Sequence, residues 1–376
     1  MRRRSLLILL AVLAGLVALA IAVSFSQRPG QGAGAVLLPG LKQRLNDVDS
    51  VVVHGSGDRV LATLERGQAG WTVREAGGYP ADIGRLRRNL LALGEATIIE
   101  EKTSNPEFYD RLRVDDVAKD SAGGLRLDLA SGGKTIASII VGSTGVSGAD
   151  SAYLRRAGEA PSWLVKAALD LPRETSGWLD KSITAIPASR IATVTITHPD
   201  GSTLRIDKAR AGEADFRVEG VPAGRELAFP GAGNAIAATL ADLALDSVEP
   251  LAKFAPGTVR PTIARFETFD GLVVEANTWQ LPAGARLRVA ARADPALAAR
   301  YAPAPAATPA PGPAAETIAA AVRKDFAEVQ AEAGQLNARL GGWVYGIPSY
   351  KVEQLTRRLD DLLAPKAAPG TAAPSR

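Results

Sequence analysis

Apolar and polar residues alternate in two stretches that lie far apart in the chain. The first is VDSVVVHGSGD, residues 48–58, and the second is IATVTITHPDG, residues 191–201. Alternation with a period of two is typical of β-strands that bury one face, and each stretch ends in residues that favour a turn. The stretches contain His54 and His198, the only histidines in the chain. This raises the question of whether the two residues share a site.

The residues after both strands repeat the same order of elements. A second strand, a strand with an aromatic residue, a loop and an amphipathic helix follow in each case. Asp82 and Asn234 are the candidate N-caps of the two helices, and Gly94 follows the first helix as a C-cap would. The apolar positions on one face of each predicted helix are Ile83, Leu86, Leu90 and Leu93 in the first, and Ile236, Leu240 and Leu243 in the second.

A third copy of this ending is predicted near the C-terminus. Residues 341–362 read GGWVYGIPSYKVEQLTRRLDDL and place Trp343 where Trp71 stands in the first unit. A hairpin with its turn at Asp270-Gly271 precedes this copy, and a long helical pattern over residues 316–340 interrupts it. We therefore predict an internal repeat.

A separate module is predicted between the first two units. Residues 124–142 form two alternating strands around a Ser-Gly-Gly-Lys turn, and residues 151–156 add another strand. The segment PSWLVKAALDLP, residues 161–172, is predicted to be a short helix. The fold class that results is α+β, with repeated antiparallel sheets that are each covered on one face by helices.

The N-terminus has the pattern of a membrane segment. Arginines at positions 2–4 precede the uncharged run LLILLAVLAGLVALAIAV, which Ser24 and Phe25 extend. An apolar run of about 18 or more residues can cross a bilayer, so Leu6 to Phe25 is predicted to be a single transmembrane helix. Arginines before it should stay cytoplasmic, which places the rest of the chain on the periplasmic or outer face of the inner membrane. The alternative is a signal peptide, cleaved near the A-x-A-like residues 20–22, which would release the chain into the periplasm.

These signals divide the chain into segments. An anchor or signal segment (1–26) and a Gly/Pro-rich tether (27–40) come first. A disordered tail (365–376) is predicted to end the chain. The segments between them are a first repeat unit (41–120), the middle hairpin module (121–187), a second repeat unit (188–260) and a third repeat unit (261–364) that contains a Pro/Ala linker at 303–315.

Composition narrows the classes of function. Hydrophobic residues make up 46% of the 376 residues, which is enough for a packed core. The net charge of +4 includes the three arginines of the leader, and without them it is +1. No nucleic-acid partner is predicted, because such a partner usually requires a basic face. The chain contains no cysteine, which excludes disulfides, thiolate catalysis and cysteine metal sites.

Each motif that suggests chemistry has a simpler structural explanation. SGGKT, residues 131–135, lacks the upstream glycine and the following helix of a phosphate-binding loop, and its S-x-x-K spacing falls on a hairpin tip. GAGNAI, residues 231–236, is more typical of a helix start than of a dinucleotide fingerprint. His54 and His198 each end a strand with no second histidine nearby. We therefore predict no catalytic residue, no cofactor and no metal.

Trp279, Arg323 and Lys324 are the candidate contacts with a protein partner. Trp279 lies beside a turn in NTWQLPAG, whereas the other four tryptophans lie in apolar contexts that predict core packing. Arg323 and Lys324 lie on the polar side of the helical pattern over residues 316–340. The alternative for these two residues is a solvated helix face.

Several segments together resemble the bacterial "domain of unknown function 4340" family. They are GWTV and YPADIGRLRRNLLAL in the first unit, IIVGSTGVSGADSAYLRR with GWLDKSI in the middle module, and the terminal YGIPSYKVEQLTRRLDDLL. The resemblance covers most of residues 45–362. It implies a membrane-anchored envelope protein, often associated with ABC-type export systems related to gliding-motility auxiliary components. It transfers no catalytic residue.

Three functions are compatible with these observations. The leading hypothesis is a non-enzymatic, membrane-anchored envelope protein that serves as an accessory or scaffold component of a membrane assembly. The alternative is a periplasmic module that binds a glycan, peptide or lipid. A hydrolase with an assembled site is the third hypothesis. Aligning Val51 with Val194 sets His54 opposite Thr197, so the repeated feature is the apolar alternation and not the histidine.

Overall fold

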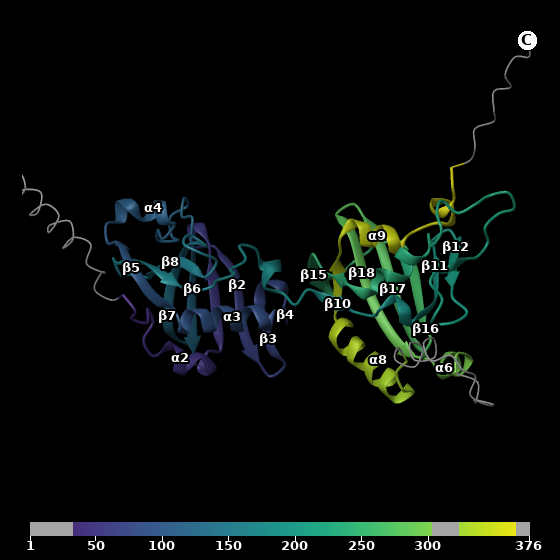
Figure 1. The fold of residues 1–376 in the computed structure, drawn as a ribbon, viewed down its shortest axis with the longest axis horizontal. Helices are drawn as coiled ribbons and strands as arrows, with labels where there is room; N and C mark the ends of the chain where they lie inside the picture. Colours follow the sequence, from purple (N-terminus) through teal and green to yellow (C-terminus); the bar gives the residue numbers. More distant parts are fainter. Residues whose placement is uncertain (1–32, 303–322, 366–376) are drawn as a thin grey trace, which may run out of the picture. The chain divides into compact units, whose positions relative to one another are not determined.

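The protein is described by a computed structural model that covers residues 33–302 and 323–365 (Figure 1). These residues divide into two compact units, the first ending at Asp180 and the second beginning at Lys181. The predicted transmembrane segment, Leu6 to Phe25, lies outside the described residues, as do the Pro/Ala linker and nearly all of the predicted tail. Within the described ranges, no helix is both long and apolar enough to span a bilayer.

The described strands of the first unit form one antiparallel sheet of nine strands, in the order β4-β3-β2-β1-β6-β7-β8-β9-β5. Along β1 the buried residues are Val51 and Val53, and their neighbours are only partly buried, which confirms the predicted one-sided strand. The strand bounds are β1 Ser50–His54, β2 Val60–Gly67, β3 Gly70–Val73, β4 Tyr79–Pro80, β5 Thr97–Thr103, β6 Leu125–Ser131, β7 Lys134–Thr144, β8 Ser151–Arg156 and β9 Ser162–Lys166.

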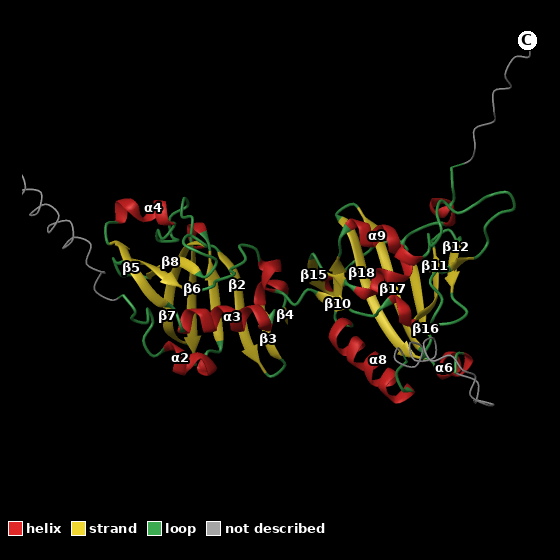
Figure 2. Ribbon diagram, viewed as in Figure 1, coloured by secondary structure: helices red, strands yellow, loops and turns green. Residues whose placement is uncertain are grey.

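The helix α3 (Ile83–Gly94) crosses the sheet of the first unit (Figure 2). A carboxylate oxygen of Asp82 accepts a hydrogen bond from the backbone N–H of Arg85 at 2.8 Å, so the predicted N-cap is confirmed. Leu86, Leu90 and Leu93 are buried as predicted, whereas Ile83 in the first turn is exposed. The other helical elements of the first unit include α2 (Leu41–Arg44), α4 (Tyr109–Leu112) and the 3-10 turn η5 (Thr175–Trp178).

The second unit is built on an antiparallel sheet of eight described strands, in the order β13-β12-β11-β16-β17-β18-β19-β15, with β10 and β14 forming a small separate sheet. The predicted hairpin around Asp270-Gly271 is confirmed, because it joins β16 to β17. The strand bounds are β10 Ser182–Thr184, β11 Ile191–Thr197, β12 Thr203–Asp207, β13 Arg217–Val218, β14 Leu243–Ala244, β15 Ser247–Pro250, β16 Thr262–Thr268, β17 Leu272–Leu281, β18 Gly284–Ala293 and β19 Trp343–Gly346.

Helices of the second unit contact the sheet in two ways. The helix α9 (Ser349–Leu355) packs against β16 and β17. The helix α8 (Phe326–Leu340) lies along β18, where the side-chain amide of Asn337 bonds to the backbone N–H and C=O of Ala291 at 2.8 and 2.6 Å. The remaining described helices and 3-10 turns of this unit are η6 (Ala188–Arg190), α5 (Asn234–Ala237), η7 (Ala238–Ala241), η8 (Leu251–Lys253), α6 (Pro295–Arg300) and η9 (Leu359–Leu362).

Both units repeat one strand order. Apart from β4, the first sheet reads β3-β2-β1-β6-β7-β8-β9-β5, which matches the order of the second sheet position by position. An isolated bridge also recurs, between Ala81 and Leu179 in the first unit and between Leu227 and Leu363 in the second. The chain therefore contains one architecture twice.

This arrangement differs from the predicted three repeats and middle module. The strands of the middle module pair with β1 through β6 and continue the first sheet. The strands assigned to a third unit pair with β11 through β16 and complete the second sheet. The physical reason is that β1 and β11 would each expose a row of unpaired backbone N–H and C=O groups along their second edge if no further strand paired there. By position in the sheets, Trp343 in β19 corresponds to Trp163 in β9, not to Trp71 in β3.

Two predicted helices also differ in the structure. The segment 161–172 contains the strand β9 in place of a helix, because its apolar run is buried between β8 and β5. The second amphipathic helix is only α5 followed by η7, and Leu243 lies in β14. Gly233 takes the N-cap position there, and the Asn234 side chain accepts a hydrogen bond from the N–H of Phe216 at 3.0 Å.

The long helix begins later than its pattern indicated. The described part starts at Phe326, behind a capping box formed by Asp325 and Glu328. Residues 316–322 of the predicted helix lie outside the described residues.

Candidate functional site

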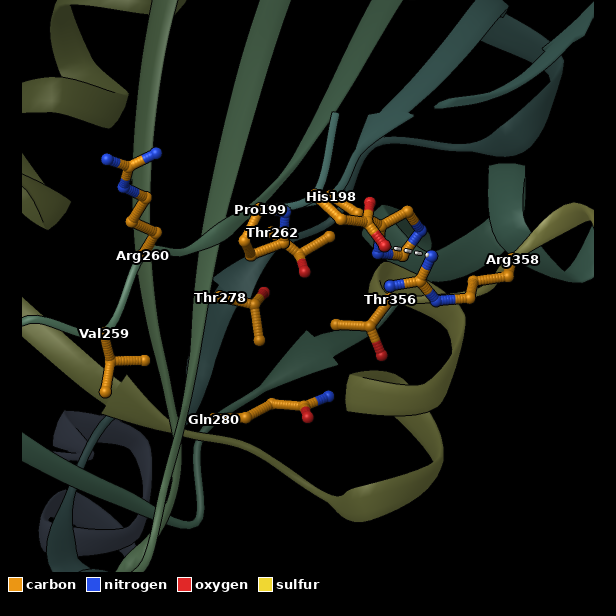
Figure 3. A pocket seen from close by; sticks show the side chains of 10 residues that line it. His198, Pro199, Val259, Arg260, Thr262, Thr278, Gln280, Thr356 and Arg358 are labelled. Atoms are coloured by element: carbon orange, nitrogen blue, oxygen red, sulfur yellow. Dashed lines mark ion pairs between the residues drawn. The ribbon is translucent and has the colours of Figure 1, made fainter. Parts of the chain in front are cut away.

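A polar cavity of about 340 Å³ lies in the second unit, beside the sheet face that α9 covers (Figure 3). Its walls come from the turn after β11, from β16 and β17, and from the residues after α9. The lining residues that matter chemically are His198, Asp200, Thr262, Thr278, Thr356 and Arg358.

Thr262 and Thr278 form the floor of this cavity. They face each other across β16 and β17, and the next pair on the same sheet face is Ala264 with Ala276. Both threonines are buried, with exposed fractions of 7% and 1%. The hydroxyl oxygen of Thr278 has no hydrogen-bond partner among the described residues. A buried hydroxyl in that state destabilises a fold, so this position is chemically unusual.

His198 closes one side of the cavity and is buried. Its backbone N–H donates to the carbonyl of Ser202 at 2.9 Å, which forms the turn after β11. Its Nε2 lies 3.3 Å from the carbonyl oxygen of Arg357. Because a carbonyl only accepts, Nε2 carries the proton and Nδ1 of the neutral ring is an acceptor. Burial, followed by the charge of Arg358, lowers the pKa of His198 below 6.5.

Asp200 and Arg358 form an ion pair at the mouth of the cavity. Arg358 Nη1 lies 2.9 Å from Asp200 Oδ2 and donates to the Ser202 hydroxyl at 2.7 Å. The hydroxyl and N–H of Ser202 donate to Asp200 Oδ1 at 2.6 and 2.9 Å. These hydrogen bonds, aided by Arg358, hold the pKa of Asp200 far below its usual value. The mouth therefore has a permanent but internally neutralised pair of charges.

The arrangement is suited to binding through neutral hydrogen bonds. The Thr262 hydroxyl and the Gln280 amide can each donate and accept. The proton of His198 is directed at a carbonyl, so it is not hydrogen-bonded to a nucleophile. In the described part of the chain, no group of three or more His, Asp or Glu side chains is arranged to hold a metal ion.

His54 belongs to the first unit and has separate partners. Its Nδ1 lies 3.1 Å from Asp58 Oδ1 and its Nε2 lies 3.2 Å from Asp128 Oδ2. Arg126 pairs with the same two carboxylates, at 2.9 and 3.0 Å. The Ser138 hydroxyl also donates to Asp128. The interacting groups therefore run from the Ser138 hydroxyl to the Asp128 carboxylate and then to His54. A catalytic triad requires the histidine between the serine and the carboxylate.

The three residues predicted to contact a protein partner each interact with other residues of the second unit. Trp279 is half-buried and its ring packs edge-on against Phe254, with centroids 5.1 Å apart. Arg323 donates to the carbonyls of Ala298 and Tyr301. Lys324 Nζ lies 3.0 Å from Glu332 Oε2. Their role in binding a partner stays a prediction.

The glycine-rich motifs have the predicted structural roles. SGGKT joins β6 to β7, with positive φ angles of 56° and 75° at Gly132 and Gly133. GAGNAI leads into α5.

Sequence reasoning missed the cavity residues Thr262, Thr278, Thr356 and Arg358. A signal for two of them was present. Counting from the Asp270-Gly271 turn sets Thr262 opposite Thr278, on the face that carries Ala264, Phe266 and Val274. A polar pair in an otherwise apolar row indicates either a functional or a strained position. Thr356 and Arg358 come from a distant segment, and local pattern could not connect them to these strands.

Comparison with known proteins supports the family resemblance for part of the chain. Residues 71–256 match the family model described as "Domain of unknown function (DUF4340)". The match begins in β3 and ends after β15, so it includes parts of both units. No curated protein and no solved structure matches the chain.

Proposed function

We propose that this protein is a non-enzymatic component of the bacterial envelope that presents two related sheet units to a protein partner. Residues 6–25 would anchor it in the inner membrane, with both units on the periplasmic side. The partner would be a membrane assembly, an ABC-type transporter in the most specific form of the proposal.

The observation that carries this proposal is the duplication of one sheet architecture. Repeated modules create extended binding surfaces without requiring a catalytic centre. The geometry of the histidines supports a non-enzymatic role, because His54 lies between carboxylates and the proton of His198 is directed at a carbonyl. The apolar leader supports the anchor.

Crosslinking in intact membranes tests the partner. A tagged full-length chain, expressed at its natural level, is crosslinked and analysed by mass spectrometry. We expect reproducible crosslinks from both units to one integral membrane protein. Recovery of only the uncrosslinked chain, while control complexes in the same membranes are captured, would count against a scaffold role.

The anchor is tested separately by alkaline extraction of membranes. The full-length chain should stay in the pellet. A matched variant, in which a cleavable signal peptide replaces residues 1–26, should appear in the soluble fraction. Release of both proteins would show that the leader is removed in the cell.

Ligand binding is the second candidate function, and the cavity around Thr262 and Thr278 favours it. A hydrolase is the third. A gene for the double variant His54→Ala, His198→Ala is introduced into a deletion strain. If it fully complements the deletion, histidine-based hydrolysis is excluded.

A further inference from the structure

The duplication allows the cavity to be compared with the same place in the first unit. In the first sheet Val53 pairs with Ala62 and Leu127. In the second sheet Ile196 pairs with Leu204 and Ala264. The alignment of Val51 with Val194 makes Val53 and Ile196 equivalent positions. The adjoining hairpins agree with this, because Leu125 pairs with Val141 and Thr262 pairs with Thr278 across the same separation in the chain.

The two threonines replace an apolar pair. Leu125 and Val141 face each other across β6 and β7, at the positions that Thr262 and Thr278 hold across β16 and β17. Leu125 and Val141 are 3% and 2% exposed, so they fill this region with hydrocarbon. Valine has nearly the shape of threonine and would avoid the unmet hydroxyl at position 278. The threonine therefore has no packing advantage there.

The wall formed by His198 also differs between the units. Gly55 is the equivalent residue, and its N–H donates to the carbonyl of Arg59 at 2.9 Å as that of His198 does to Ser202. A bulge after Val53 inserts Leu61 in the first unit, and a Cβ on Gly55 would lie 3.1 Å from the Leu61 side chain. The pairing of β11 with β12 has no such bulge.

The first unit is thus filled with apolar side chains where the second unit is polar and hollow. Polar residues in place of equivalent core residues indicate function when they carry an unmet hydrogen-bonding group. We propose that the cavity of the second unit binds a neutral, polyhydroxylated ligand of about monosaccharide size. This inference rests on the second candidate function and is independent of the scaffold role.

Size and chemistry both favour such a ligand. A volume of about 340 Å³ lies at the small end of ligand pockets. Sugar hydroxyls both donate and accept, and so do the Thr262, Thr278 and Thr356 hydroxyls and the Gln280 amide. In Figure 3 the two threonines lie at the centre of these groups, with Gln280 below them. The Thr278 oxygen is itself buried, so the contacts with a ligand in the cavity would come from Thr262, Thr356 and Gln280.

A small anion fits the site less well. The guanidinium of Arg358 is already neutralised by Asp200 at 2.9 Å. The remaining cation, Arg260, is exposed, and its guanidinium is turned away from the threonines (Figure 3). An anion at the floor would gain no unpaired positive charge and would lie near the Asp200 carboxylate.

Isothermal titration of the full-length chain in detergent tests the inference. The neutral probes are glucose, galactose, myo-inositol and glycerol, and the anionic probes are acetate and inorganic phosphate. We expect saturable binding of at least one sugar or polyol and none of the anions. No saturable binding of any neutral probe, or binding of an anion instead, would overturn the inference. A trisaccharide of the bound sugar then distinguishes a free sugar from a glycan end, because only the latter should bind more tightly.

Three variants locate the binding. Thr262→Val removes one cavity hydroxyl without changing the shape and should weaken binding at least about fivefold. Gln280→Ala is on the surface, cannot disturb the core, and should also weaken binding. Thr197→Val, on the opposite face of the sheet beside His198, is the matched control and should bind as the unmodified chain does. Unchanged affinity in both Thr262→Val and Gln280→Ala would contradict the assignment, and the crosslinking result would not be affected.

Discussion

Arg190 is a buried cation whose carboxylate partners come from separate elements of the second unit. It lies 2.9 Å from Asp270 in the β16–β17 turn and 3.0 Å from Glu332 in α8. Lys324 also pairs with Glu332, at 3.0 Å. A buried charge that loses its partner is costly. The cluster therefore stabilises the packing of α8 against the sheet as long as its carboxylates stay ionised.

Glu332→Gln should destabilise the second unit by about 2 kcal/mol, since it weakens the charge-assisted interactions with Arg190 and Lys324. Urea unfolding followed by circular dichroism measures the change. Glu328→Gln, on the same helix, alters only the capping box and should cost less. Equal stability of Glu332→Gln and the unmodified chain would show that the cluster contributes nothing net.

The stabilising effect of Glu332 should also depend on pH. Burial opposes ionisation of Glu332, but hydrogen bonds and charge from Arg190 and Lys324 outweigh it and lower its pKa below 4.5. A lowered carboxyl pKa stabilises the fold fully above pH 4.5, and this contribution is lost as the pH falls through the folded-state value. The stability gap between the unmodified chain and Glu332→Gln should therefore narrow below pH 4.5. Denaturation curves at several pH values between 6 and 3 check this, and a constant gap would contradict it.

His198 can be followed directly because the chain has only two histidines. Burial and the charge of Arg358 lower its pKa below 6.5. In a proton NMR titration we expect one imidazole signal to titrate below that value, and His198→Gln should remove this signal. Arg358→Gln should raise the pKa of His198, because it removes a nearby positive charge. A His198 signal that titrates at or above 6.5 would show that the ring is solvated and does not close the cavity.

At the scale of elements, α3 depends on its N-cap. The Asp82 carboxylate accepts from the N–H of Arg85 at 2.8 Å, so Asp82→Ala should lower the stability of the first unit by about 1 kcal/mol. Glu95→Ala is the control, because Glu95 at the other end of the helix makes only an exposed ion pair with Lys42. Thermal unfolding compares the two. Similar melting temperatures for both variants would mean that the cap is not significant.

Elements with strong local signals could be predicted from the sequence, and those that depend on distant partners could not. The helix at residues 83–94 has both periodicity and a cap, and the Asp270-Gly271 turn defines its hairpin. The segment 161–172 is an apolar run without a clear period, so helix and strand were equally compatible with it. It became β9 because β8 and β5 lie on either side, which is non-local information.

The candidate site followed the same rule. The histidine His198 was visible in the sequence, but its neighbours Thr356 and Arg358 lie more than 150 positions away. Thr262 and Thr278 stood out only once the register of β16 and β17 and the equivalent pair in the first sheet were known. A polar substitution in one copy of a repeat is visible only when both copies are correctly aligned.

For the whole molecule, one strand order recurs in two sheets, whereas the apolar pattern predicted three shorter repeat units. The apolar pattern identified strands and helices but did not show which strand pairs with which. Both sheets are completed by strands from later in the chain, so the repeating length is about twice what the pattern suggested. The two units defined in this way each have their own sheet and their own buried core.

Each unit should therefore fold without the other, provided that it is cut at the right place. Residues 171–180 belong to the first unit although they follow its last strand. The carbonyl of Trp178 accepts from the N–H of Asp82 at 2.8 Å, and the Trp178 side chain is only 1% exposed. A fragment of residues 33–180 should unfold cooperatively, whereas a fragment of residues 33–170 should lose about 3–5 kcal/mol, the cost of removing a buried tryptophan. Urea titrations of both fragments measure this. Equal stability of the two would mean that Trp178 is not part of the core, and an unfolded 33–180 fragment would mean that the first unit requires the second.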